Sequence, residues 1–189
     1  MDVRIALLGS GSVGWAVAAA IAAPEQPLSQ ASPILVACHD SRCGGVFDPD
    51  GIDAWALTTA ARTGSFGSLV AATSGWDATA VAAIVDYDVL VELSAPDPRS
   101  GEAATSRIQL ALERGRCACT TNSAAAELHR ARLDALAARH GGAWACIRTD
   151  GATVVQAVID DLTALAETVV ARRGVRMQVP EPTVAGSIP

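Results

Sequence analysis

A glycine motif placed between a strand and a helix constrains the fold of this chain more than any other feature. An apolar run over residues 3–8 leads directly into Gly9, Gly11 and Gly14, spaced G-x-G-x-x-G, and an alanine-rich stretch over residues 15–23 follows. The apolar run is typical of a buried strand and the alanine-rich stretch of a helix. In this context the three glycines allow a tight turn, close approach of the backbone to a pyrophosphate, and close helix–strand packing. A turn that binds nothing is the alternative, and the flanking strand and helix favour anion binding at the helix start.

Strand-like and helical segments alternate along the rest of the chain. We expect strands over residues 3–8, 34–38, 88–93, 117–120 and 143–147, and helices over residues 15–23, 52–62, 77–85, 102–114, 124–140 and 152–173. Residues 41–50 resemble a loop, and residues 63–75 fit no regular element. This alternation predicts an α/β fold, a doubly wound parallel sheet of the Rossmann type with helices on both faces. We assign residues 1–174 to one dinucleotide-binding domain and residues 175–189 to a tail, with room for one strand over residues 175–179.

Composition limits the partners and the chemistry. The chain has 189 residues, half of them hydrophobic, and a formal net charge of −6, which argues against a nucleic-acid partner. No apolar run is long enough to cross a bilayer and the first strand begins without a leader, so we expect a soluble cytoplasmic protein with no membrane partner. All 14 basic residues are arginine, so no step can use a lysine of this chain as acid, base or Schiff-base former.

The five cysteines predict core packing rather than a metal site. Their number is odd and none of them forms a C-x-x-C pair, the spacing typical of zinc or redox sites. Most fall in strand-like segments, where cysteine behaves as a small apolar side chain. The residues are Cys38, Cys43, Cys117, Cys119 and Cys146.

The segments that directly follow the strands carry a family resemblance. In parallel α/β sheets ligands bind beyond the carboxyl ends of the strands, so these segments are the place to search for a site. Taken together they resemble the cofactor domain of homoserine dehydrogenases over about residues 3–158. The matching segments are the glycine motif over residues 9–14, residues 40–42 and 44–53, residues 88–95 (D-V-hydrophobic-V-E and the turn after it), residues 101–102 and 111–115, and residues 120–122, where the family has V-T-A-N-K.

The resemblance implies a function and shows two departures from it. It implies an NAD- or NADP-dependent oxidoreductase acting on a small alcohol, aldehyde or amino-acid-like substrate. Ser123 stands where the family has a lysine thought to assist proton transfer, and a hydroxyl cannot replace an ammonium in that role near neutral pH. Nothing in the chain corresponds to the family's substrate-binding and dimerising domain. We therefore expect a homo-oligomer or a separate substrate-domain partner; the alternative is a nucleotide-binding sensor, a regulatory subunit or a Rossmann fold with other chemistry.

The candidate residues for coenzyme binding lie after the first two strands. The first turn supplies the candidate phosphate-binding residues, which are Gly9, Gly11, Ser12, Val13 and Gly14. Asp40 and Arg42, which follow the second strand, bear on the choice between NAD and NADP. Asp40 can accept the hydroxyls of an adenosine ribose, which favours NAD slightly, whereas Arg42 can instead accommodate the 2′-phosphate of NADP. A helix cap or a loop charge is the alternative for either residue.

Further candidates follow the later strands, and no catalytic residue can be assigned. The resemblance places Ser94 and Ala95 beside the nicotinamide, with a simple turn before Pro96 as the alternative. Asn122 is expected to point into the same crevice or to cap the next helix. Asp150 is a possible general base, although a helix cap fits it better, and His39 is expected to be half-exposed. Glu92, inside a buried strand, belongs either to a hydrogen-bonded core network or to the wall of the site.

Overall fold

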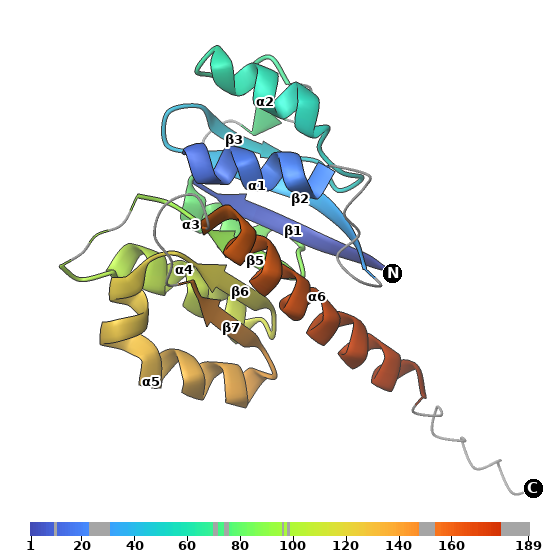
Figure 1. Ribbon diagram of the computed structural model, residues 1–189, viewed down its shortest axis with the longest axis vertical. Coiled ribbons are helices and arrows are strands. Elements are labelled where there is room, and N and C mark those ends of the chain that lie inside the picture. Colours follow the sequence, from blue (N-terminus) through green and yellow to red (C-terminus); the bar gives the residue numbers. More distant parts are fainter. Residues whose placement is uncertain are drawn as a thin grey trace, which may run out of the picture.

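The computed structural model describes residues 1–9, 11–22, 31–69, 72–73, 76–95, 97, 99–147 and 154–178 of the chain. Within these residues a seven-stranded sheet has the order β4-β3-β2-β1-β5-β6-β7, with helices on both faces (Figure 1). The strands are β1 (Asp2–Leu8), β2 (Ser32–Asp40), β3 (Gly44–Phe47), β4 (Ala72–Thr73), β5 (Val89–Glu92), β6 (Cys117–Thr120) and β7 (Ala143–Cys146). The helices are α1 (Ser12–Ala22), α2 (Ala54–Arg62), α3 (Ala78–Ile84), α4 (Glu102–Glu113), α5 (Ser123–His140) and α6 (Val154–Gln178). The predicted α/β Rossmann-type class is confirmed.

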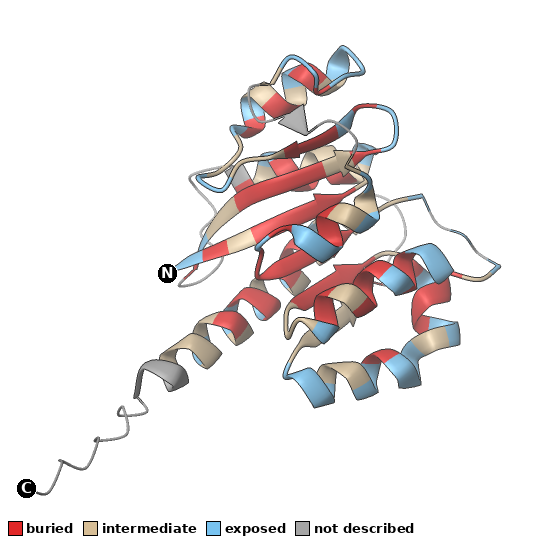
Figure 2. Cartoon of the chain, turned by 180° about the vertical axis from the view of Figure 1, so that it is seen from behind, coloured by how far each residue is buried: buried red, intermediate tan, exposed pale blue. Residues whose placement is uncertain are grey.

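Side-chain alternation along the strands builds a separate core on each face of the sheet. Val3, Ile5 and Leu7 of β1 pack with α1, α2 and α6, whereas Ala6 and Leu8 pack on the other face with α3, α4 and α5. Each buried Val or Leu side chain contributes about 1.5–3 kcal/mol relative to an exposed one. Figure 2 shows the result, with central strands buried along most of their length and outer helix faces exposed. Four of the five cysteines lie in the first of these cores, as predicted: Cys38, Cys43, Cys117 and Cys119. Cys146 is half-buried at the end of β7 and belongs to neither core.

The sheet departs from the predicted all-parallel arrangement at one edge. Strands β2, β1, β5, β6 and β7 are parallel, but β3 pairs antiparallel with β2 and with β4. The expectation of a loop over residues 41–50 was wrong for residues 44–47, because the two glycines that indicated a loop, Gly44 and Gly45, begin β3 after a tight turn. Strand β2 also begins earlier than predicted and ends later, at Asp40.

The last helix also differs from its prediction. Helix α6 runs through Gly174 and ends at Gln178, so the suggested strand over residues 175–179 is wrong for residues 175–178; residue 179 lies outside the described residues. A glycine inside a helix costs only about 1 kcal/mol, which neighbouring contacts can offset. Arg173 supplies such contacts, donating to the carboxylate of Asp88 at 2.5 Å and to the carbonyl of Asp2 at 2.8 Å. No helix in the described residues is long and apolar enough to cross a membrane.

Strand β1 lies at the point where the order of the sheet reverses. From β1 the chain crosses through α1 to β2 on one side, and β5 is the neighbour of β1 on the other. Open α/β sheets form a crevice at the carboxyl ends of the strands at such a point. The turns after β1 and β5, which carry the glycine motif and Ser94, therefore meet in the predicted place.

Candidate functional site

The turn after β1 is held tightly against its neighbours. Gly9 has φ of +89°, a left-handed conformation that favours glycine, and its N–H donates to the carbonyl of His39 at 2.8 Å. A Cβ added to Gly9 would lie 2.5 Å from backbone atoms of Leu93 and Ser94. Gly9 must therefore be a glycine, because any side chain would collide with the turn after β5. The same close contact brings Gly9 and Ser94 together.

The other two glycines of the motif have different environments. A Cβ on Gly14 would lie 2.2 Å from the carbonyl oxygen of Gly9, so the third glycine lets α1 pack closely on the turn. A Cβ on Gly11 would meet nothing within 4 Å. Gly11 is exposed and its carbonyl accepts from the N–H of Trp15 at 3.0 Å, which places Gly11 at the start of α1. Open space at the second glycine is what close approach of a ligand to this backbone requires.

Ser12 and Val13 form the first turn of α1, beside this open space. Ser12 is exposed and Val13 is half-buried. The first N–H groups of a helix have no acceptor within the helix, and its dipole adds partial positive charge at the same end. The turn therefore presents an electropositive edge of backbone at this end of the sheet.

Asp40 lies at the end of β2 and organises the turn that follows. Its Oδ1 accepts from the N–H of Arg42 at 2.8 Å and from the N–H of Cys43 at 3.1 Å. The Asp40 side chain is 8% exposed, whereas that of Arg42 is 74% exposed, and Arg42 Nε lies 3.6 Å from Asp40 Oδ1. Asp40 thus acts as a charged residue of the loop, which is the alternative to ribose binding that the sequence offered. It also lies one residue beyond His39, whose carbonyl holds Gly9.

A buried polar cluster lies at the carboxyl ends of β5 and β6. Glu92 is 0% exposed and accepts from Arg107 Nη2 at 2.8 Å, from Thr120 Oγ1 at 3.1 Å, and from the hydroxyl of Ser94. Arg107, on α4, also donates to Ser94 Oγ at 2.6 Å. The core-network alternative for Glu92 is therefore confirmed, and the Ser94 end of this network reaches the turn beside Gly9. We call Glu92, Ser94, Arg107 and Thr120 the strand-end cluster.

Asn122 follows β6 and caps the next helix. Its Oδ1 accepts from the N–H of Ala125 at 3.3 Å, and its own N–H donates to Thr120 Oγ1 at 3.0 Å. The capping alternative is therefore confirmed, and Thr120 links Asn122 to the strand-end cluster. Ser123 is exposed at the first position of α5.

The remaining candidates are placed less directly. Ala95 is exposed immediately after Ser94. His39 is half-buried, and burial lowers the pKa of its imidazole below the ordinary value. Asp150 and Pro96 lie outside the described residues. Contacts thus connect the ends of β2, β1, β5 and β6, and the predicted residues of the site lie along this edge.

Arg107 and Thr120 are the members of the strand-end cluster that the sequence-based list of site residues lacks. Arg107 is on a helix whose polar residues suggest an ordinary exposed face, and no motif singles it out. The available signal was Glu92: a carboxylate within a buried strand needs a cationic or hydroxyl partner nearby. The Arg107 side chain is 11% exposed, and its buried Nε has no hydrogen-bond partner in the described structure.

The reversal of the sheet at β1, the glycine turn at that point and the acidic residue at the end of β2 define a Rossmann-type α/β domain. No model of a known protein family matches the chain. An NAD(+)-dependent homoserine dehydrogenase of Pseudomonas canavaninivorans is 35% identical over 142 residues, which cover 72% of this chain and 40% of that protein. The chain is thus a relative of the homoserine dehydrogenases and resembles their nucleotide-binding domain.

Solved structures share the fold. A hyperthermophilic archaeal homoserine dehydrogenase in complex with NADPH superposes with a TM-score of 0.65 at 22% identity, covering 77% of this chain and 44% of that chain. The homoserine dehydrogenase of Thermoplasma acidophilum gives a TM-score of 0.60 at 23% identity, covering 77% of this chain and 43% of that one. This chain therefore spans less than half of the length of the relatives that it matches.

Proposed function

We propose that the chain binds a nicotinamide dinucleotide, NAD(H) or NADP(H), in the crevice between the turns after β1 and β5. The observation that carries the proposal is the contrast between the three glycines: Gly9 and Gly14 are closed by backbone, and only Gly11 faces open space. Two of the three positions thus shape the turn, and the third leaves the backbone accessible to a pyrophosphate. The relatives named above support this interpretation, since one is NAD(+)-dependent and another binds NADPH.

Different residues of the chain would contact different parts of the coenzyme. The backbone N–H groups of Ser12 and Val13 would hold the pyrophosphate, Asp40 the adenosine ribose, and Ser94 and Ala95 the nicotinamide side. Asn122 would border the far side of the same crevice. When bound, the coenzyme supplies hydride transfer, and the protein supplies binding, orientation and electrostatics.

Calorimetric titration of the whole chain with NAD+, NADH, NADP+ and NADPH tests the proposal. A methyl group on Gly11 would fill the space through which the ligand approaches, so Gly11→Ala is expected to weaken binding by at least tenfold without lowering thermal stability. Gly174→Ala is the matched control, because a Cβ there also meets nothing within 4 Å and the position is in α6, away from the turn. Absence of binding for all four dinucleotides, or equal binding by Gly11→Ala, would reject the proposal.

Asp40 favours NAD over NADP. Its carboxylate is held nearly buried, and a 2′-phosphate at the ribose would meet its negative charge. Asp40→Asn keeps an oxygen for the N–H groups of Arg42 and Cys43 but removes the charge. We expect it to narrow the ratio of NADH to NADPH affinity by about tenfold, the effect of 1.4 kcal/mol. Arg42→Gln is the control, and it is expected to leave NADPH affinity unchanged. A loss of NADPH affinity in this variant would show instead that Arg42 binds the 2′-phosphate.

We further propose that the domain of residues 1–174 acts in an oxidoreductase whose substrate site is completed by a second copy, another protein or the segment after residue 174. The substrate would be a small alcohol, aldehyde or amino-acid-like molecule.

Ser123 supports a second candidate function, dinucleotide binding without turnover, because its exposed hydroxyl cannot serve as the proton donor or acceptor that a lysine provides. We expect the purified chain alone not to reduce NAD+ with homoserine at an appreciable rate. Robust turnover would exclude the second candidate.

A further inference from the structure

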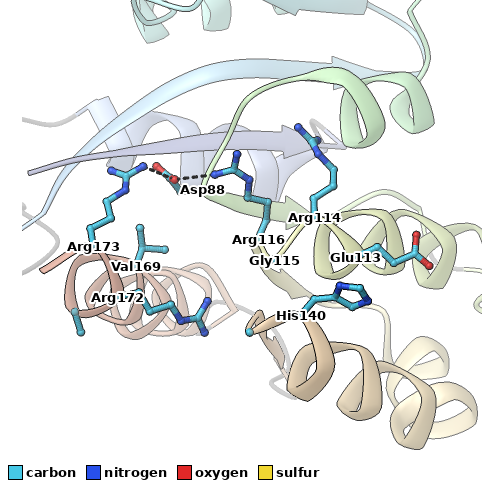
Figure 3. Close-up of a pocket in the computed structure, with 11 residues that line it drawn as sticks. Asp88, Glu113, Arg114, Gly115, Arg116, His140, Val169, Arg172 and Arg173 are labelled. Carbon is cyan, nitrogen blue, oxygen red and sulfur yellow. Dashed lines mark hydrogen bonds and ion pairs between the residues drawn. The ribbon is translucent and has the colours of Figure 1, made fainter. Parts of the chain in front are cut away.

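A cavity lies at the opposite edge of the sheet from the glycine turn. It has a volume of about 880 Å³, and its walls come from the residues that precede β5, β6 and β7 and from the last third of α6 (Figure 3). Strand β5 has four residues, so its first and last Cα atoms are roughly 10 Å apart at about 3.3 Å per residue. A ligand in this cavity would therefore be remote from the proposed coenzyme site.

The charge of the cavity wall is opposite to that of the whole chain. Arg114, Arg116, Arg172 and Arg173 line it together with two carboxylates, those of Asp88 and Glu113, although the chain carries a net charge of −6. Arginine presents a planar, permanently charged fork that matches the oxygens of carboxylates and phosphates. The lining side chains thus carry an excess of positive charge that an oxyanion can neutralise, although Asp86, beside the cavity, offsets part of it by pairing with Arg116 Nη2 at 2.8 Å.

Most of these arginines are already engaged. Asp88 is 3% exposed and pairs with Arg116 Nη1 at 3.4 Å and with Arg173 Nη2 at 2.5 Å. Arg114 donates to the carbonyls of Ala82 and Val85 at 2.9 and 2.7 Å. These contacts fix the wall in place.

Arg172 differs from the other three because no oxygen atom of the described residues accepts a hydrogen bond from it. Among the described residues its hydrogen-bonded partner is the thiol of Cys117, with Nη1 to Sγ at 3.8 Å, and no carboxylate lies within ion-pair distance. Burial raises the pKa of this thiol more than Arg172 lowers it, so the thiol stays neutral and does not compensate the guanidinium. In Figure 3 the Arg172 side chain extends from α6 toward the end of α5, where His140 lies. Its charge thus faces the cavity without an acidic partner.

We propose that this cavity is a binding site for a small dianion, a phosphate or a dicarboxylate, with Arg172 as its principal ligand. The size of the cavity suits a small molecule, and the net negative charge of the chain argues against a polyanion such as nucleic acid. The site is independent of the proposed coenzyme site and extends beyond the proposed function. A bound dianion would link α6 to the starts of β5 and β6, and would raise the thermal stability of the chain.

Calorimetry of the whole chain with inorganic phosphate and with succinate, at ionic strength held constant with chloride, tests the site and separates the two sources of dianion. Arg172→Gln is expected to weaken binding of the preferred anion by at least tenfold. Arg172→Lys keeps the charge but not the fork, so it is expected to retain part of the affinity and guards against a loss caused by misfolding. Arg132→Gln, an exposed arginine on α5, removes the same charge elsewhere and is expected to leave the affinity within twofold of the original.

Two outcomes would overturn the proposal. One is the absence of saturable binding for both anions at constant ionic strength. The other is equal anion affinity for Arg172→Gln and Arg132→Gln, which would mean that the anion responds to the overall surface charge and not to a site at Arg172. Titration of Arg172→Gln with NADH distinguishes this proposal from the preceding one, since its coenzyme affinity is expected to be unchanged.

Discussion

Replacing Arg107 with methionine tests whether the strand-end cluster holds the carboxyl ends of β5 and β6 in place. Glu92 is 0% exposed and its Oε1 lies 2.8 Å from Arg107 Nη2. Among the described residues the substitution would leave this buried carboxylate with only the hydroxyls of Ser94 and Thr120 as partners. Removing one partner of a buried ion pair costs about 3–5 kcal/mol. A single kcal/mol shifts the melting temperature of a chain of this size by about 2–4 °C, so the variant is expected to melt at least 6 °C lower.

The assay is urea unfolding and thermal melting of a double-mutant cycle. Arg107→Met with Glu92→Gln removes the unpaired charge as well, so the double variant is expected to recover at least half of the lost free energy. Arg132→Met, at an exposed position on α5, is the control and is expected to change stability by less than about 0.5 kcal/mol. A loss below about 1 kcal/mol for Arg107→Met, or a double variant no more stable than the single one, would refute the assigned role of the pair.

Two further predictions concern packing and pH. Gly14→Ala places a methyl group 2.2 Å from the carbonyl oxygen of Gly9, so thermal melting is expected to show a loss of about 1–3 kcal/mol, and unchanged stability would contradict the packing. The pKa of Tyr87 is raised to about 12, chiefly by burial, whereas that of an unfolded tyrosine is about 10. Its contribution is therefore complete below pH 10 and is lost as the pH rises from 10 to 12, by about 2–3 kcal/mol in total. The chain has no lysine and Tyr87 is its one tyrosine, so urea unfolding across this range is expected to show a shallower loss for Tyr87→Phe, and equal slopes would contradict it.

The sequence predicted the central part of the fold because the periodicity of apolar residues and the positions of turn and helix-capping residues agree there. The glycine turn follows a continuous apolar strand, Asp53 and Asp77 stand at helix N-caps, and Gly115 and Gly141 have the left-handed φ expected after a helix. Each of these signals is local, so each can be recognised without knowledge of the tertiary structure.

The failures arose where tertiary pairing decided the outcome. Strand β3 has only four residues and begins with two glycines, and it exists because β2 offers an edge after a turn held by Asp40. Helix α6 passes Gly174 because Arg173 is anchored to Asp88, which precedes β5 far away in the sequence.

The candidate site was predictable to a similar degree. The glycines, Asp40, Ser94 and Asn122 follow strands, and the rule that parallel strands end at one edge brings them together. Arg107 reaches the same edge from α4, and its role depends on the packing of that helix against Glu92. The cavity that contains Arg172 depends on the approach of α6 to the starts of three strands, which no sequence spacing encodes.

A crystal structure of the whole chain soaked with NADH tests the central claim most directly. The account predicts electron density for the pyrophosphate over the open position of Gly11, against the backbone of Ser12 and Val13, with the nicotinamide on the side of Ser94. Density for NADH elsewhere on the chain, or an empty crevice at a saturating concentration of NADH, would contradict it.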